Sequence, residues 1–302
     1  METDPQAICA QLNALAADAS LLAPGNLAGR EEALGLVEWA EALVRLRKWE
    51  DLAALRRRAG SLRRQLAQVD RALFDQVRAG IRSGALRGEA LRARLDPFTR
   101  YRRGERGQVH AGYDALDRLV EGVLRLGRPP TAQRALDREM IQLELTPARA
   151  VLELVDSVPL GPGDLFLDLG SGLGQVTILV HLLTGARARG IEREPAYCQF
   201  ARERAAELRL KGVEFLNLDA RAADYGEANV AFMFAPFTGS ILREVLDRLE
   251  RETRARRLVV CSYGPSTATV AAQPWLRPLG PTAAHPYALA TFASGESLDA
   301  DS

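Results

Sequence analysis

Between residues 165 and 262 the chain alternates short apolar runs with longer stretches of helical periodicity. The predicted strands cover residues 165–169, 187–192, 213–218, 230–234 and 258–262, and the predicted helices cover residues 148–158, 176–183, 195–210 and 241–251. Strands that alternate with helices imply right-handed crossovers and a parallel sheet covered by helices on both faces. Two last strands, at 275–279 and 287–293, have no room for a helix between them, which predicts an antiparallel hairpin at the sheet edge.

Residues 7–127 carry apolar side chains at helical spacing and few strand signals, which predicts helices without a recognisable catalytic signature. Breaks between these helices are predicted at residues 23–25, near Gly60, at 83–84 and at 96–97. Pro129 and Pro130 remove two successive backbone donors and fix an extended segment. The predicted fold is therefore α/β, with an all-helical N-terminal domain over residues 1–128 and a second domain over residues 129–302.

Charge is unevenly placed along the chain. The formal net charge is +1, but residues 45–107 hold 18 Arg or Lys residues against 7 Asp or Glu residues. This segment fits an acidic partner, nucleic acid included, and it equally fits the solvated helix faces of an Arg-rich protein. The three cysteines lie far apart without the spacing of a zinc site or a disulfide framework, so no metal is expected. No signal peptide or membrane span is evident, which predicts a cytoplasmic location.

The strongest chemical signal is the glycine-rich turn after the first predicted strand. Asp168 stands near the end of that strand, and Gly170, Gly172 and Gly174 allow a sharp backbone turn that a ligand can approach closely. The dinucleotide-binding pattern G-x-G-x-x-G would need a glycine where the chain has Gln175, and no Gly-Lys-Ser/Thr follows as in a P-loop. Nothing in this turn favours a pyrophosphate ligand.

Acidic residues end the next two predicted strands. Glu192 follows Gly174 by 18 residues, where its carboxylate can accept hydrogen bonds from both hydroxyls of a ribose. Asp219 ends the third strand and can accept a hydrogen bond from an adenine amino group. Because the carboxyl ends of parallel strands meet at one edge of the sheet, Asp168, Glu192 and Asp219 are expected in a single crevice. With the glycines, these acids predict a site for an adenosine-containing cofactor.

The segment Asp168-Leu-Gly-Ser-Gly-Leu-Gly174, followed by Gly190-Ile-Glu192 and Leu218-Asp219-Ala220, resembles the class I S-adenosylmethionine (SAM)-dependent methyltransferases. The resemblance covers about residues 140–294. It implies a Rossmann-like seven-stranded sheet with a terminal antiparallel strand, SAM as the cofactor and methyl transfer as the activity. It also implies a cofactor-binding set, in which Asp168 and Gly170 lie near the methionine end of SAM, Glu192 on the ribose, and Asp219 with Ala220 beside the adenine. The full set is Asp168, Gly170, Ser171, Gly172, Gly174, Gln175, Glu192, Asp219 and Ala220.

A narrower resemblance concerns the run from Asp168 to Val176 and the helical module before it. These features are similar to the non-SET histone-lysine methyltransferases, whose basic surface would suit residues 45–107. That family has an asparagine-containing Asn-Phe loop after its fourth strand, whereas this chain departs from the pattern with Phe-Met-Phe-Ala-Pro-Phe at residues 232–237.

The loop after the fourth strand is where such enzymes hold the methyl acceptor. The predicted substrate-binding residues are therefore Phe234, Ala235, Pro236 and Phe237. Phe234 cannot supply the polar acceptor used by enzymes that act on exocyclic base amines, which disfavours that reaction without excluding it. The two phenylalanines either form an aromatic clamp around a flat or cationic acceptor or simply pack beneath the loop.

No general base is assigned from the sequence. Thr146 and Glu144 precede the 148–158 helix and are expected to close over the carboxylate end of SAM. Candidates for proton transfer are Tyr113, Tyr225, Tyr263, His110, His181 and His285.

The predicted function is SAM-dependent methyl transfer to an acceptor of unknown class, selected with help of the helical N-terminal domain. The alternative is a non-catalytic protein with the SAM-binding fold, whose basic helices bind nucleic acid or a protein partner. A nicotinamide-dependent oxidoreductase is disfavoured by Gln175.

Overall fold

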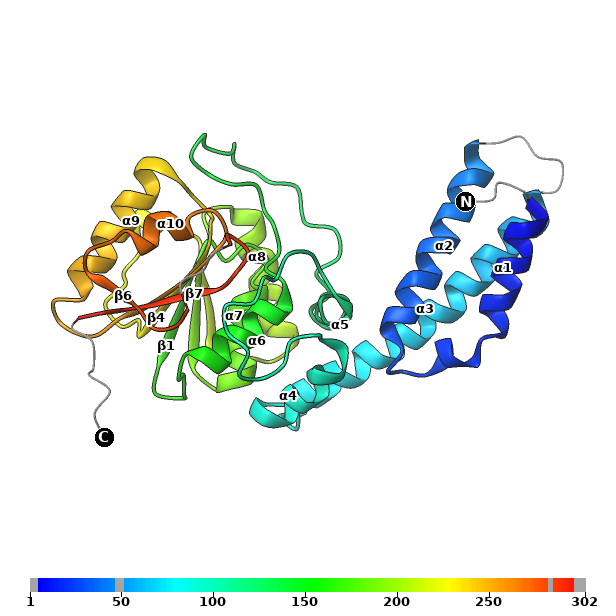
Figure 1. Cartoon of the computed structure of the whole chain (residues 1–302), viewed down its shortest axis with the longest axis horizontal. Coiled ribbons are helices and arrows are strands. Elements are labelled where there is room, and N and C mark those ends of the chain that lie inside the picture. The colour runs from blue at the N-terminus through cyan, green and yellow to red at the C-terminus, as the bar shows by residue number, and fades with distance from the viewer. Residues whose placement is uncertain (1–4, 47–51, 282–284, 296–302) are drawn as a thin grey trace.

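The computed structural model describes residues 5–46, 52–281 and 285–295. Figure 1 shows a body built around a sheet and a helical arm that projects from it. The helices before residue 128 are α1 (Pro5–Ala17), η1 (Ala19–Leu22), α2 (Leu27–Leu46), α3 (Leu52–Ser83), α4 (Gly88–Leu95), η2 (Asp96–Phe98) and α5 (Ala115–Leu124). Within the described residues, no helix is long and apolar enough to cross a membrane.

The arm consists of α1, α2 and the first half of α3. Its core is formed by apolar residues from all three helices, among them Leu12, Val37 and Leu62. The predicted helix breaks at residues 23–25, 83–84 and 96–97 are confirmed, but the one near Gly60 is wrong because α3 continues through it. A single glycine costs a helix only about 1 kcal/mol, and burial of the flanking leucines on α3 outweighs that cost.

Asp70 on α3 joins the arm to the body. Its carboxylate accepts hydrogen bonds from Arg30 on α2 and from Arg118 on α5. Arg30 is fully buried, and its remaining N–H groups donate to the carbonyl oxygens of Leu21, Ala23 and Pro24. A buried charge is tolerated only when it is paired and hydrogen-bonded, and Arg30 and Asp70 meet that condition.

A seven-stranded sheet forms the centre of the body, with the order β3-β2-β1-β4-β5-β7-β6. Its first five strands are parallel, and β7 is antiparallel to both of its neighbours, which confirms the predicted fold class and the edge hairpin. The strands are β1 (Leu165–Leu169), β2 (Arg187–Ile191), β3 (Val213–Leu216), β4 (Val230–Phe234), β5 (Val259–Tyr263), β6 (Leu276–Pro278) and β7 (Ala290–Ser294).

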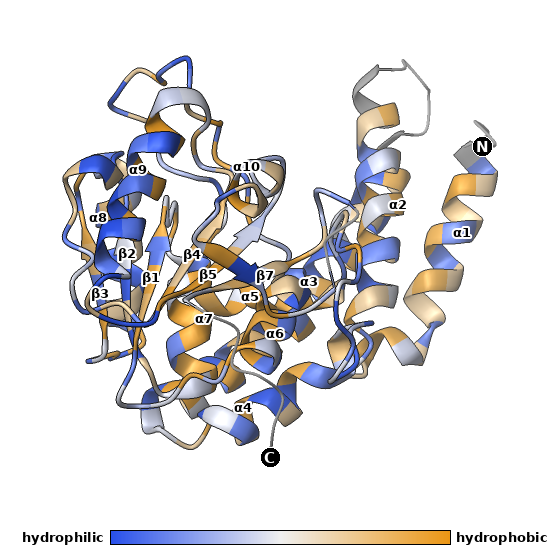
Figure 2. Cartoon of the chain, turned by 60° about the vertical axis from the view of Figure 1, so that its left-hand side comes forward, coloured by the Kyte–Doolittle hydropathy of each residue, from blue (hydrophilic) through white to orange (hydrophobic). Residues whose placement is uncertain are grey.

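Helices cover both faces of this sheet. They are α6 (Ala148–Ser157), α7 (Gln175–Thr184), α8 (Pro195–Glu207), α9 (Gly239–Glu252) and α10 (Thr267–Ala271), with the short η3 (Ala220–Ala222) after β3. Phe166 and Phe232 face α6, α7 and α8, whereas Leu167 and Met233 face α9 and α10. In Figure 2, where the ribbon is coloured by hydropathy, α7 and the strand β4 are largely hydrophobic. The short helix α10 was not predicted.

The core on the α6 and α7 side continues into the preceding helices. Leu73 and Val77 of α3 and Leu119 of α5 belong to the same apolar cluster as Phe166 of the sheet. The helices before residue 128 thus share a core with the body, and the division into domains at residue 128 stays a prediction.

Candidate active site

A cavity of about 540 Å³ lies at the carboxyl edge of β1, β2 and β4. Its volume is in the range of small-molecule and cofactor sites. Of the residues predicted from the sequence, the cavity is lined by Gly170, Gly172, Glu192, Asp219, Ala220, Phe234, Ala235, Pro236 and Phe237. The structure therefore brings residues from the ends of four strands to one place, as the parallel topology requires.

Four of the predicted cofactor residues do not line the cavity: Asp168, Ser171, Gly174 and Gln175. Asp168 is on the sheet face covered by α7, where its Oδ2 accepts a hydrogen bond of 2.7 Å from the Thr177 hydroxyl. This burial raises the pKa of Asp168 to about 7, more than the Thr177 hydrogen bond lowers it. Gln175 is buried too, and its Nε2 donates to the carbonyl oxygen of Thr146 at 2.9 Å. Contact of these residues with a cofactor stays a prediction.

Glu192 ties the glycine-rich turn to the end of β2. Its Oε2 accepts a 2.8 Å hydrogen bond from the backbone N–H of Gly172, and its Oε1 accepts one of 2.7 Å from Glu194. The N–H groups of Gly170 and Ser171 donate to the Ile191 carbonyl oxygen. Burial raises the pKa of the Glu192 carboxyl, against the lowering effect of these backbone donors.

Gly174 ends the turn with φ +83° and packs directly on the core. A Cβ there would lie 2.6 Å from the Phe215 ring and 2.8 Å from Ala201. We expect Gly174→Ala to lower the free energy of unfolding by about 1–3 kcal/mol, through left-handed strain and overpacking. Urea denaturation measures this, with Gly35→Ala as the control. Gly35 is exposed inside α2 with no atom near its added Cβ, so that variant should gain about 0.5–1 kcal/mol. Equal stability of the two variants would contradict the expected strain.

Asp219 lies at the other side of the cavity, where it caps η3. Its carboxylate accepts hydrogen bonds of 3.0 and 2.9 Å from the Arg221 guanidinium and one of 2.9 Å from the Arg221 backbone N–H. The Arg221 hydrogen bond holds the pKa of Asp219 below its usual value. A carboxylate has about four lone-pair sites, so Asp219 retains capacity for a further donor.

The loop after β4 forms the opposite wall. Ala235 adopts a positive φ of +37°, and Pro236 packs so closely on Gly170 that a Cβ there would lie 2.3 Å from the proline ring. The ring of Phe234 meets Tyr263 edge-on at 4.8 Å, and Tyr263 meets Tyr287 at 5.9 Å. Phe237 is buried and packs in the core with the α9 residues. Both phenylalanines also line the cavity. They can therefore pack beneath the loop and still contact a methyl acceptor.

Residues 132–144 form the remaining wall, and the sequence analysis did not predict this. The segment has no helix or strand and runs over the body in Figure 1, where it is drawn in green. Its cavity-lining residues include Arg134, Leu136, Met140, Ile141 and Leu143. Glu144 also lines the cavity, whereas Thr146 does not.

Residues 143–233 match the family model described as "Histone methylation protein DOT1". The matched residues make up less than a third of the chain. The match includes the glycine-rich turn, Glu192 and Asp219, which surround the cavity. The match, the fold and the cavity together indicate SAM-dependent methyl transfer as the activity of this chain. The predicted fold, cofactor and activity are thereby confirmed, with the methyl acceptor unspecified.

Solved structures similar to this methyltransferase include three with modest overlap. An RNA methyltransferase from Salinibacter ruber in complex with S-adenosyl-L-homocysteine (SAH) is 24% identical, covers 53% of this chain and 100% of its own, and has a TM-score of 0.40. A precorrin-6y C5,15-methyltransferase from Geobacter metallireducens GS-15 is 18% identical, with coverages of 54% and 94% and a TM-score of 0.40. A SAM-dependent methyltransferase from Thiobacillus denitrificans, also with SAH, is 22% identical, with coverages of 40% and 52% and a TM-score of 0.31. No curated protein matches the chain.

None of the six candidates for proton transfer lines the cavity of the methyltransferase. Tyr225 is buried and donates to the Ala220 carbonyl oxygen, and His181 contacts the Ala186 carbonyl oxygen. His110 pairs with Glu153 in the core, and His285 is exposed. The hydroxyl of Tyr263 donates to the His110 carbonyl oxygen, and that of Tyr113 to Leu145. The tyrosines that do line the cavity are Tyr197 and Tyr287, which the sequence did not single out.

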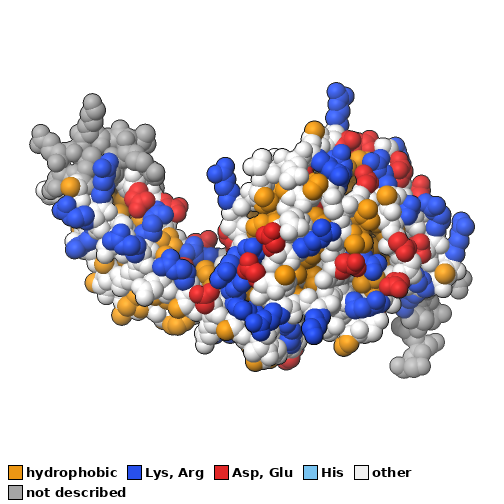
Figure 3. Space-filling model, turned by 180° about the vertical axis from the view of Figure 1, so that it is seen from behind, with side chains coloured by type: hydrophobic (Ala, Val, Ile, Leu, Met, Phe, Trp, Pro, Cys, Tyr) orange, Lys and Arg blue, Asp and Glu red, His pale blue; other side chains and the backbone are white. Residues whose placement is uncertain are grey.

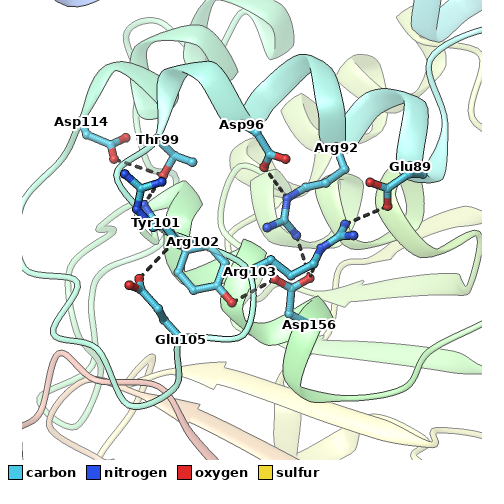
Figure 4. A network of polar contacts seen from close by, with 10 residues as sticks. All are labelled: Glu89, Arg92, Asp96, Thr99, Tyr101, Arg102, Arg103, Glu105, Asp114 and Asp156. Carbon is cyan, nitrogen blue, oxygen red and sulfur yellow. Dashed lines mark hydrogen bonds and ion pairs between the residues drawn. The ribbon is translucent and has the colours of Figure 1, made fainter.

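A polar network holds residues 89–114 against the body (Figure 4). Asp156 on α6 accepts hydrogen bonds from Arg92 at 2.7 Å and from the Tyr101 hydroxyl at 2.9 Å, and Arg92 also donates to Asp96 at 2.6 Å. The same segment carries His110, whose backbone N–H donates to the Tyr287 carbonyl oxygen at 2.7 Å. The network therefore supports the position of Tyr287 at the cavity.

Proposed function

We propose that SAM binds in the cavity with its ribose hydroxyls on Glu192, its adenine beside Asp219 and Ala220, and its methionine end toward Gly170. The volume of the cavity and the two carboxylates at the ends of neighbouring strands support this placement. When bound, SAM supplies an activated methyl group, so the residues of this chain need only align the acceptor and exclude water.

We propose that the methyl acceptor is carried on a protein. The single observation behind this proposal is the distribution of exposed apolar side chains. The large hydrophobic residues that the described part of the chain leaves exposed are Leu22, Val109, Tyr113, Leu136, Ile141 and Leu218. Of these, Leu136, Ile141 and Leu218 line the cavity.

Two more of these residues contact segments that line the cavity. Val109 pairs with Ala288, the neighbour of Tyr287, and Tyr113 is bonded to Leu145, the neighbour of Glu144. Exposed apolar patches of this kind mark protein-binding surfaces, and a small acceptor enclosed by the cavity would not need them. The description of the matched family model, a histone methylation protein, agrees with a protein acceptor.

The basic face of α3 supports an acidic protein as the partner. Arg57, Arg64 and Arg71 recur every seven residues and are exposed, so they lie along one side of the helix. Figure 3 shows Lys and Arg side chains over the arm and around its junction with the body. Such a surface attracts an acidic protein by long-range electrostatics. The cytoplasmic location stays a prediction.

Radiolabelled-methyl transfer from SAM into a cell extract tests the acceptor class. We expect the label in the protein fraction. Label confined to nucleic acid or to small molecules would contradict a protein acceptor, and absence of label from every fraction would favour the non-catalytic alternative. A variant with Arg57, Arg64 and Arg71 all changed to Gln should label the same protein more weakly, with the largest difference from wild type at low salt.

A further inference from the structure

We infer that Glu194 and Glu139 are positioning residues that fasten residues 132–144, here termed the strap, over the cofactor cavity, and that release of the strap limits SAM and SAH exchange. This inference rests on the proposed binding of SAM in the cavity. Glu194 and Glu139 thus act on the strap, whereas the glycine-rich turn and the acids at the strand ends act on the cofactor.

Glu194 fastens the start of the strap. Its carboxylate accepts hydrogen bonds of 3.0 and 2.9 Å from the backbone N–H groups of Gln133 and Arg134. It also accepts one of 3.0 Å from Ala196 and so caps α8. These backbone donors hold the pKa of Glu194 below its usual value, although burial acts in the opposite direction. The residue is only two positions from Glu192, so the strap is held beside the predicted ribose site.

Glu139 fastens the middle of the strap to the start of α9. Its Oε2 accepts hydrogen bonds of 2.7 Å from the Ser240 hydroxyl and 3.0 Å from the Ile241 backbone N–H. The Thr238 side chain provides no cap for α9, so Glu139 satisfies one of the helix's unpaired donors from outside. The backbone N–H of Thr238 also donates to the Glu139 carbonyl oxygen at 2.7 Å.

Besides these carboxylates, the strap is held by Arg193, which donates to the Ala135 carbonyl oxygen at 3.2 Å, and by Met140 and Leu143, which are partly buried against the core. It has no regular secondary structure, its outer side is largely exposed, and its inner side lines the cavity. One end is fastened on the predicted cofactor side and the middle is fastened beside the acceptor loop, where Ile141 N–H donates to the Pro236 carbonyl oxygen at 3.1 Å. A segment without regular secondary structure, most of whose residues are exposed, opens at lower free energy than the core. Loss of one carboxylate should therefore release the strap without unfolding the protein.

Glu194 has two roles, because it holds the strap and caps α8. The Glu194→Asp variant distinguishes these roles. Aspartate is a preferred N-cap residue, so α8 should keep its cap, but the shorter side chain withdraws the carboxylate from Gln133 and Arg134. The test is a chase of bound tritiated SAH with unlabelled SAH, together with the equilibrium Kd and the unfolding midpoint of the free protein. We expect the dissociation and association rate constants to rise together by about tenfold, with Kd changed by less than about threefold and the unfolding midpoint unchanged.

Two further variants complete the test. Glu139→Ala removes the oxygen that accepts from Ser240 and Ile241 and should show the same joint rise in both rate constants. Glu203→Ala removes an exposed carboxylate on α8 and should show none. Unchanged exchange rates in Glu194→Asp and Glu139→Ala would overturn the inference. A rise in dissociation alone would also overturn it, since it would assign these residues to affinity rather than to exchange. Failure of the wild-type protein to bind SAH would instead contradict the proposed function.

Discussion

Replacing Glu192 by alanine is expected to lower the affinity of the methyltransferase for SAH by about 100-fold or more. In the proposed complex the carboxylate accepts hydrogen bonds from both ribose hydroxyls, and hydrogen bonds to charged groups contribute about 1.5–3 kcal/mol each. The same carboxylate holds the glycine-rich turn through the Gly172 N–H, so its loss also loosens the backbone beside the cofactor. Isothermal titration calorimetry with SAH measures the change directly.

Two further variants, Asp219→Ala and Glu203→Ala, serve as comparisons for Glu192→Ala. Asp219→Ala should weaken SAH binding less, by about tenfold, because the Asp219 carboxylate already shares its oxygens with Arg221 in the free protein. Glu203→Ala removes an exposed carboxylate from α8 and should leave the affinity unchanged. Wild-type affinity in both Glu192→Ala and Asp219→Ala would refute the proposed assignment of these residues to the cofactor.

Replacing Asp168 by asparagine is expected to stabilise the free protein at pH 8 and to leave it nearly unchanged at pH 4. Burial raises the pKa of Asp168 to about 7, whereas an unfolded aspartate ionises near pH 3.8. Between these values the folded state holds a proton that the unfolded state has released. Its contribution to stability is therefore fully present below about pH 4 and is lost as the pH rises through 7.

The size of this effect follows from the shift. A difference of one pKa unit corresponds to about 1.4 kcal/mol, so the wild-type protein loses on the order of 4 kcal/mol over this window and the asparagine variant does not. Asparagine still offers Oδ1 to the Thr177 hydroxyl. The measurement is urea denaturation of both proteins at several pH values. The difference between their free energies of unfolding is compared across pH, so that the contributions of other titrating groups cancel. A difference that does not change with pH would show that Asp168 is ionised in the folded protein.

Much of the fold was predictable because its signals are local. The apolar runs of β1 and β4 and the turn glycines Gly170, Gly172 and Gly174 determine the strand, the turn and the helix within a few residues. Glu192 and Asp219 line the cavity, as predicted, because the parallel topology brings the ends of the strands together. Gly60 was misinterpreted as a break because its local cost is outweighed by packing within the arm.

The rest of the site depends on contacts between residues distant in the sequence. The strap has no periodicity, and its path is set by Glu139 and Glu194, which in the sequence look like ordinary surface acids. Strand alternation places the side chain of Asp168 under α7 beside Thr177, and its contact with a cofactor stays a prediction. Tyr287 is brought to the cavity by a backbone hydrogen bond to His110, far away in the chain.

A crystal structure of the methyltransferase with SAH tests the central claim most directly. We predict the ligand between the strap and the strand ends, with both ribose hydroxyls within about 3 Å of the Glu192 carboxylate. Ligand density elsewhere on the protein, or a ribose that does not contact Glu192, would contradict the account.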